Sequence, residues 1–443
     1  MPKAPLLYTA LKEVIEFAVE DGLLLALSAT GVCVVFATGT WERLGFLNST
    51  ADEHIRSIIV NKARRELVVT SFQYLDCLGD HHPLRCRAVA LQDLVARRFP
   101  APSAPIFGSE GSISWPGFVD VDGDTATALT YNPATKLYKV WDLRDYSPRL
   151  IIRGRGIQDI CLHSPDVALV TLHGSSGVLP IQLRSLVDGT VLREFCIPLG
   201  AAGEPEVLHL FGQHLLVRLP GGSLTITDSV SGSCVEVGDL ALQHLQVFSH
   251  CPVSNTVLAF GDDGMRVFSL QGQQLGHVPG CVLPDRKLEN AMHISRQEKH
   301  MVVYTGSHQH PAAPERTAAQ GGPAGPTSQG GGGTASSDAA GSSSPAWFGS
   351  YGSSRREDSS SDHRFMVPDI GRIGASMGVV DLQRCKWLAR LHAGRARRPE
   401  AVRQQHPDVE LAALANVTAV YYDEMRCCIY TGSADGFVHI WRL

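Results

Sequence analysis

Short apolar runs of four to seven residues, each followed by a polar turn, recur along most of the chain. The first group holds four such runs, and Gly22, Gly31 and Gly39 lie in the three separators between them. Glycine adopts the positive φ of a tight hairpin at no steric cost, so each separator is typical of a turn between antiparallel strands. The spacing therefore predicts four strands, at 14–19, 23–28, 32–37 and 41–46.

This four-strand unit recurs, whereas the 3.6-residue spacing of helices is nearly absent. Further units are predicted at 55–99, 116–152, 157–196, 207–237, 245–278, 291–305 with its continuation at 376–391, and 417–443. The last unit has three strands, while Leu6–Ala10 near the start has no unit of its own. A closed ring leaves no open sheet edge, so we expect Leu6–Ala10 to be the outer strand of the last unit. The pattern predicts one all-β propeller over residues 1–443, with eight four-stranded blades, or alternatively seven.

Two polar stretches interrupt this rhythm. Residues 308–362 are rich in Gly and Ser, and their apolar content is too low to offset the entropy lost on ordering. We interpret them as a disordered insertion within the penultimate blade, either a tolerated surface insertion or a tether or phosphorylation segment. Residues 393–413 form an arginine-rich loop between the last two blades, which is either solvated or contacts an acidic partner.

The amino-acid composition limits the class of protein and indicates its cellular compartment. Hydrophobic residues make up 44% of the 443, charged residues make up 19%, and the formal net charge is −5. This balance gives no general field that would attract nucleic acid or an anionic membrane. The 11 cysteines include no C-x-x-C pair, which argues against a zinc site and favours a reducing compartment. With no apolar stretch of 18 residues and no signal-peptide pattern, we expect a cytoplasmic and/or nuclear protein.

Two segments resemble the WD40 repeat. Lys139–Leu143, which contains Trp141 and Asp142, is similar to the third strand of such a repeat, and so is Phe437–Trp441 with the turn before it. The resemblance implies a WD40-type propeller. It also implies that Ser433, Asp435 and Trp441 in the last unit, and Trp141 and Asp142 in the third, take part in the structural network of such blades.

A narrower resemblance joins several motifs. Trp115–Val119, Tyr138–Leu143, Ile157–Ile160 and Ile181–Ser185 are similar to an uncharacterised plant and algal family of WD40-repeat-like proteins. This resemblance supports the propeller and implies no particular activity.

Known catalytic motifs do not appear in the sequence, so we assign no catalytic, cofactor-binding or metal-binding residue. The resemblance to WD40 proteins implies a non-catalytic scaffold or adaptor that binds other proteins. One alternative is a substrate receptor of a cullin–RING ubiquitin ligase, because Trp141-Asp142-Leu143-Arg144 resembles the motif by which some WD40 proteins dock on the ligase adaptor. Arg144 would be the docking residue, or it is an ordinary exposed arginine after a strand. A third alternative is a propeller enzyme with its active site in the central channel.

Overall fold

The computed structural model describes residues 6–8, 13–73, 84–107, 118–305, 376–392, 414 and 417–442, with short gaps at 123–125, 133, 155, 165–166, 175–176, 200–204, 206, 212, 220–223, 230, 238–246, 252, 262 and 284–290. The predicted insertion at 308–362 and the predicted arginine-rich loop at 393–413 lie outside the described residues. Both therefore remain predictions.

The described chain is nearly all β: 32 strands form eight antiparallel sheets of four strands each. The first four blades are ordered along the sequence. Blade 1 contains β2 (Val14–Glu20), β3 (Leu23–Ser28), β4 (Cys33–Ala37) and β5 (Arg43–Phe46). Blade 2 contains β6 (Glu53–Asn61), β7 (Glu66–Gln73), β8 (Arg85–Ala90) and β9 (Ser103–Pro105). Blade 3 contains β10 (Phe118–Asp122), β11 (Thr127–Asn132), β12 (Leu137–Asp142) and β13 (Ser147–Arg153). Blade 4 contains β14 (Ile157–Ser164), β15 (Val167–Leu172), β16 (Val178–Ser185) and β17 (Val191–Pro198).

The second half repeats the arrangement. Blade 5 contains β18 (Val207–Phe211), β19 (His214–Arg218), β20 (Leu224–Asp228) and β21 (Cys234–Val237). Blade 6 contains β22 (Val247–Cys251), β23 (Thr256–Gly261), β24 (Gly264–Ser269) and β25 (Gln274–Pro279). Blade 7 contains β26 (Met292–Ile294), β27 (His300–Thr305), β28 (Ser376–Asp381) and β29 (Lys386–His392). Blade 8 contains β30 (Val417–Asp423), β31 (Cys428–Ser433) and β32 (Phe437–Arg442), together with β1 (Leu6–Tyr8).

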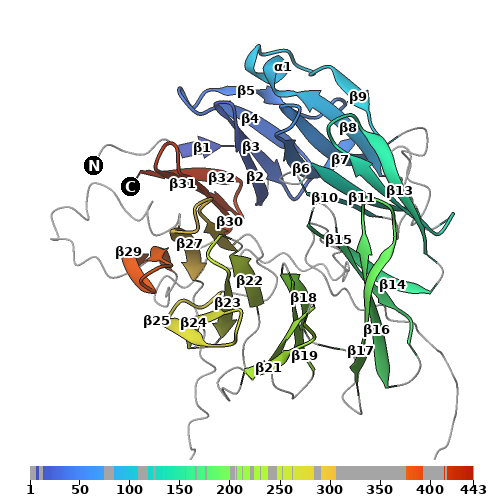
Figure 1. Cartoon of the computed structure of the whole chain (residues 1–443). Helices are drawn as coiled ribbons and strands as arrows, with labels where there is room; N and C mark the ends of the chain where they lie inside the picture. The colour runs from blue at the N-terminus through green and yellow to red at the C-terminus, as the bar shows by residue number, and fades with distance from the viewer. Residues whose placement is uncertain are drawn as a thin grey trace, which may run out of the picture.

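The blades follow one another round a ring, from blue at blade 1 through green and yellow to red at blade 8 (Figure 1). We name the strands of each blade A to D from the centre outward; the A strand β2, for example, contacts the A strands β6 and β30 of the neighbouring blades. The A–B and C–D turns then share one face of the ring, which we call the turn face. The B–C turns and the D–A connections share the opposite face, which we call the loop face.

Apolar side chains pack between the blades rather than within them. Strand β3 is buried at every position because it has a neighbouring sheet on each side, whereas the outer strand β9 is exposed throughout. In the described residues, eight apolar clusters each join one pair of adjacent blades. One of them joins blade 8 to blade 1 through Tyr430 and Ile440 against Leu24 and Phe36. The packing therefore continues round the whole ring.

Strand β1 closes the ring in the way the sequence predicts. It pairs antiparallel with β32, with Leu6 opposite His439 and Tyr8 opposite Phe437, and so forms the D strand of blade 8. Eight blades are confirmed, and the alternative of seven is wrong. The strand covers Leu6–Tyr8 rather than the predicted Leu6–Ala10, whose last two residues lie outside the described part.

Blade 2 departs from the predicted unit. The sequence placed all four strands within 55–99, but the D strand β9 begins at Ser103. The short helix α1 (Leu91–Val95) occupies the C–D connection and buries Leu91 and Leu94 against the core between blades 1 and 2. Two apolar residues three apart form one side of a helical turn, so this segment packs as a helix where blade 1, for example, connects its C and D strands by a short turn.

Candidate interaction surface

The two predicted WD40-type tryptophans make the same contact in different blades. Trp141 in blade 3 donates its indole N–H to Thr130 Oγ1 at 2.9 Å. Trp441 in blade 8 donates to Thr431 Oγ1, also at 2.9 Å. Ser433 accepts the backbone N–H of Phe437 at 3.1 Å, and Asp435 lies exposed in the same B–C turn. The tryptophans thus meet threonines that sequence reasoning did not include in the network.

The register between the B and C strands explains why each tryptophan contacts that particular threonine. Trp141 lies opposite Ala128, and Thr130 follows two residues later on the same side of the B strand. Trp441 lies opposite Ile429, and Thr431 follows two residues later. In blade 6 the corresponding positions hold Phe268 and Ala259, so both members are apolar there. A threonine on the B strand and a tryptophan on the C strand could have predicted this contact from the sequence. The prediction would have required knowledge of the strand register.

Asp142 and Arg144, the other predicted residues of blade 3, lie on the turn face. One oxygen of Asp142 accepts the backbone N–H of Arg144 at 2.8 Å, and the other lies 3.5 Å from the Arg144 guanidinium and accepts bonds from Arg149 at 2.5 and 3.0 Å. Burial would raise the pKa of Asp142, but the hydrogen bonds from Arg144 and Arg149 hold it below its usual range. The Asp142 side chain is 17% exposed and the Arg144 side chain is 65% exposed. The guanidinium therefore faces solvent and is held by a less exposed carboxylate.

The same arrangement recurs in two other turns of this face. In blade 8, Asp423 accepts the backbone N–H of Arg426 and pairs with its guanidinium, both at 3.1 Å. In blade 7, Asp381 accepts the backbone N–H of Arg384 at 2.9 Å and lies 3.9 Å from its guanidinium. In both pairs the arginine is the more exposed partner. An aspartate at the end of a strand thus caps the turn and also orients an arginine toward solvent.

Pairs of this kind also join neighbouring blades. Arg65 of blade 2 pairs with Asp21 of blade 1 at 2.8 Å, and the arginine is 75% exposed against 22% for the aspartate. Between blades 2 and 3, Arg64 donates to the backbone carbonyl of Arg144 at 2.9 Å, and Asn61 donates to that of Leu143 at 2.8 Å. These contacts fix the turns of blades 1, 2 and 3 relative to one another.

The turns of blades 6, 7 and 8 are joined by carboxylates instead. Glu298 of blade 7 accepts the backbone N–H groups of Val253 and Ser254 in blade 6, at 2.9 and 2.8 Å. Glu424 of blade 8 accepts the backbone N–H of Arg296 in blade 7. Since each bond spans two blades, the turn face is held together along the parts of the ring where these turns are described.

The loop face presents charge differently. Asp263, in the B–C turn of blade 6, is 54% exposed, while its partner Arg266 is 12% exposed. Here the carboxylate lies outward and the guanidinium inward, the reverse of the pairs on the turn face. At this turn of the loop face, the charge offered to a partner is therefore negative.

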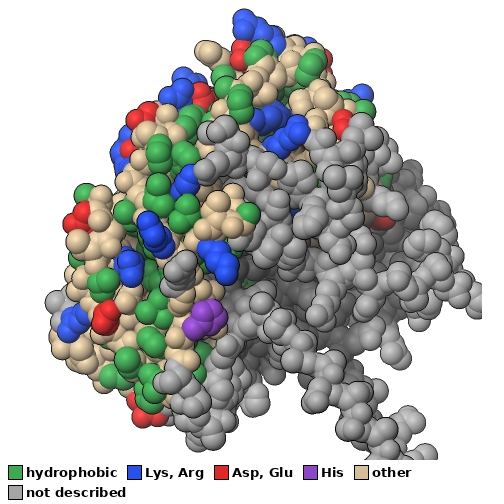
Figure 2. Space-filling view, turned by 90° about the vertical axis from the view of Figure 1, so that its right-hand side faces the viewer, with side chains coloured by type: hydrophobic (Ala, Val, Ile, Leu, Met, Phe, Trp, Pro, Cys, Tyr) green, Lys and Arg blue, Asp and Glu red, His purple; other side chains and the backbone are tan. Residues whose placement is uncertain are grey.

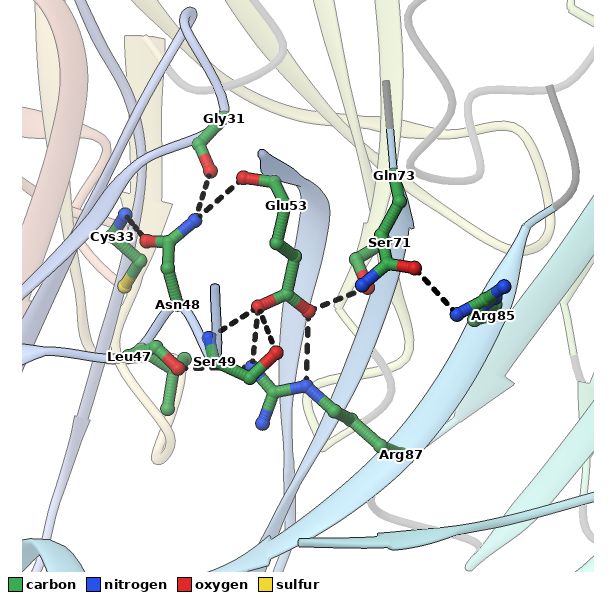
Figure 3. Close-up of polar contacts among 10 residues, drawn as sticks. All are labelled: Gly31, Cys33, Leu47, Asn48, Ser49, Glu53, Ser71, Gln73, Arg85 and Arg87. Carbon is green, nitrogen blue, oxygen red and sulfur yellow. Dashed lines mark hydrogen bonds and ion pairs between the residues drawn. The ribbon is translucent and has the colours of Figure 1, made fainter. Parts of the chain in front are cut away.

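A buried ion pair holds the connection from blade 1 to blade 2 on the loop face (Figure 3). Glu53, 3% exposed, accepts bonds from Arg87 at 3.0 and 3.1 Å and from Ser71 at 2.7 Å. Burial would raise the pKa of Glu53, but Arg87 and the other donors hold it below its usual range. Asn48 bridges the Gly31 and Glu53 carbonyls with its amide group. The network fixes the path of residues 47–53, with both charges compensated inside the molecule.

A family model described as Domain of unknown function (DUF7899) matches residues 4–321, that is 318 of the 443 residues. The chain belongs to the DUF7899 family. The match spans β1 of blade 8, blades 1 to 6 and the first two strands of blade 7. A search of curated proteins found no match to this DUF7899 protein.

Three solved structures align with nearly the whole of this chain. The computationally designed Ika8 protein aligns with a TM-score of 0.52 at 12% identity, covering 98% of this chain and 96% of that one. The C-terminal WD40 domain of Sif2 aligns with a TM-score of 0.50 at 11% identity, covering 100% and 99%. BamB from Moraxella catarrhalis aligns with a TM-score of 0.45 at 11% identity, covering 100% and 99%. At these identities the likeness concerns the fold alone, which for the DUF7899 protein is an eight-bladed β-propeller.

Within the described residues, no group of three or more His, Cys, Asp or Glu side chains lies close enough to hold a metal ion. The helices of the same part of the DUF7899 protein include none with the length and apolar character needed to cross a bilayer.

Proposed function

We propose that this DUF7899 protein is a non-catalytic scaffold that holds other proteins against the turn face of its propeller. The observation that carries the proposal is the set of exposed arginines on this face, each oriented by a more buried carboxylate. Such a guanidinium is already placed before a partner arrives, so less side-chain entropy is lost on binding. The closed ring provides the rigid support that a binding surface of this kind needs.

The site around Arg144 is the specific docking point in this proposal. Its backbone is fixed by Asp142, its carbonyl accepts a bond from Arg64, and Leu143 beside it is fully buried. The side chains of Arg144 and Asp145 extend from this fixed turn into solvent. A side chain held in this way is well suited to form hydrogen bonds with an oxygen acceptor on a partner.

A substrate receptor of a cullin–RING ubiquitin ligase is the second candidate. It is supported by the exposure of Arg144 in a Trp-Asp-x-Arg sequence, together with the fixed conformation of that turn. In this case the turn face around Arg144 would bind the ligase adaptor, and another surface would bind the protein to be ubiquitinated. Either role agrees with a cytoplasmic or nuclear location and with membership of a plant and algal WD40-repeat-like group, both of which we propose on the basis of the sequence.

Affinity purification of the tagged full chain, with quantitative mass spectrometry, tests both roles. Arg144→Ala is compared with Arg384→Ala, the matched control in which an arginine anchored in the same way is removed from blade 7. We expect one set of partners to fall at least fivefold in Arg144→Ala and to persist in Arg384→Ala. Recovery of a ligase adaptor and a cullin within that set selects the receptor role. A wild-type protein that retains no stable partner contradicts the scaffold proposal.

A further inference from the structure

Blade 2 carries the densest group of basic side chains on the turn face. Its A–B turn and its C–D connection contribute five exposed basic residues, which we call the blade 2 basic edge: Lys62, Arg64, Arg65, Arg97 and Arg98. Lysine and arginine side chains stand out at the upper end of Figure 2, the height at which α1 lies in Figure 1. The sequence does not bring these residues together, because about 30 positions separate the two segments.

Backbone hydrogen bonds place the two segments side by side. The Leu91 N–H, at the start of α1, donates to the Arg65 carbonyl at 3.1 Å. After the helix, the Arg97 N–H donates to the Leu94 carbonyl and the Arg98 N–H to the Asp93 carbonyl, at 3.0 and 2.9 Å. The connection is therefore folded back on itself, and its two arginines are held on the same edge as Arg65.

Each arginine of the edge is oriented by a carboxylate beneath or beside it. The Asp93 side chain is 13% exposed and accepts a hydrogen bond from one nitrogen of Arg98 at 2.7 Å. The Arg98 side chain is 65% exposed. Glu42 of blade 1 pairs with both terminal nitrogens of Arg97, at 3.0 and 2.6 Å. A guanidinium has five N–H donors, and each of these pairs engages one or two of them. The exposed side of each group retains donors that can pair with a further carboxylate.

One exposed residue of α1 is apolar. Val95, the last residue of the helix, is 51% exposed and precedes Arg97 by two positions. An apolar contact flanked by oriented guanidinium groups suits a peptide better than a simple ion. It gives such a peptide both a contact that excludes water and charges that set its position.

We propose that the blade 2 basic edge binds an extended acidic segment of a partner protein, rich in Asp and Glu. This inference rests on the scaffold role proposed above and assigns the chemistry of one partner. The formal net charge of −5 gives no general field that would hold a long polyanion such as nucleic acid along the rest of the surface. A short acidic segment meets only the edge, where its carboxylates can pair with the guanidinium donors that remain exposed.

Fluorescence anisotropy with a fluorescein-labelled deca-glutamate peptide tests the proposal on the full chain. We expect saturable binding to the wild type that weakens at least tenfold in the triple variant Arg65→Gln, Arg97→Gln, Arg98→Gln. Because Arg65 and Arg97 also join blades 1 and 2, the single variant Arg98→Gln is measured beside it and should weaken binding about threefold. Arg153→Gln, an exposed arginine on the outer strand of blade 3 that belongs neither to the edge nor to the arginine–carboxylate pairs of the turn face, should bind within twofold of the wild type.

Binding that is absent in the wild type, or unchanged in both the triple variant and Arg98→Gln, overturns the inference. Tighter binding to vesicles of phosphatidylserine and phosphatidylcholine, or to a 20-base-pair DNA duplex, than to the peptide overturns it as well. The scaffold proposal is judged separately, by the partners that the wild-type chain retains. If these persist in the triple variant, the scaffold stands and the acidic-segment inference falls.

Discussion

At the scale of single residues, Glu16 couples the propeller to pH. It lies on β2, where burial raises the pKa of its carboxyl to about 8 and a hydrogen bond from the Ile58 backbone lowers it only in part. The folded protein therefore holds a proton on Glu16 at neutral pH, while the unfolded chain, with an ordinary carboxyl, has lost it. Stability contributed by this proton is complete below about pH 4.5 and falls as the pH rises toward 8.

We predict that Glu16→Gln removes part of the loss of stability between pH 6.5 and 8. The amide keeps the shape of the protonated acid and does not titrate, so the two unfolding free energies should diverge by at most about 1.4 kcal/mol per pH unit. Urea denaturation at pH 6.5, 7, 7.5 and 8 measures the divergence. The window avoids His293, whose pKa burial lowers to about 4, because stability from that neutral imidazole is lost only as the pH falls below 6.5.

Glu42→Gln serves as the control for this titration. Arg97 lowers the pKa of Glu42, so that carboxyl is ionised in both the folded and the unfolded chain throughout the window. Its variant should keep the slope of the wild type. Parallel curves for the wild type and Glu16→Gln would contradict a proton held at Glu16.

At the scale of elements, the connection between blades 1 and 2 depends on one buried ion pair. Glu53 begins the A strand of blade 2 and reaches across to Arg87 on the C strand, and both side chains are nearly inaccessible to water. We predict that Arg87→Met lowers the free energy of unfolding by about 3–5 kcal/mol, because it leaves a buried carboxylate without its counter-charge. Chemical denaturation followed by circular dichroism measures the loss.

The double variant Glu53→Gln, Arg87→Met tests the cause of that loss. When the carboxylate is also neutralised, we expect about 1–3 kcal/mol of the stability to return, since the unpaired charge was the largest cost. Losses that simply add in the double variant would mean that packing around Arg87, rather than the charge pair, sets the effect.

How far the sequence predicts these elements depends on whether the signal is local. In blade 1 the predicted strands agree with the structure to within two residues, because a glycine such as Gly22, at a φ of +79°, marks the turn. The D strand of blade 2 was misplaced because α1 interrupts the rhythm. The contacts of Trp141 and Trp441 depend on register, and the Asp21–Arg65 pair joins residues 44 positions apart in different blades. Such contacts follow from the ring and leave no local pattern to read.

At the scale of the whole molecule, the stability of the ring depends on the contacts that close it between blades 8 and 1. Blades 8 and 1 share an apolar cluster, and β1 is the strand that covers the outer edge of blade 8. Without β1, the backbone groups of β32 that face it, between Phe437 and His439, lose their partners and form an open edge. The cost should propagate, because each blade is stabilised mainly by its neighbours.

We therefore predict that removing residues 1–11 lowers the free energy of unfolding by about 2 kcal/mol, since two or three backbone hydrogen bonds of about 1 kcal/mol each are lost. The exposed edge of β32 should also promote concentration-dependent association, visible by light scattering during thermal unfolding. Deleting residues 312–360 is the matched control: the composition of that segment predicts no contribution to the core, so its loss should leave the melting temperature within about 2 °C. A truncated protein that unfolds like the wild type, or a loop deletion that destabilises as much as the truncation, would show that closure by β1 does not set the stability of the ring.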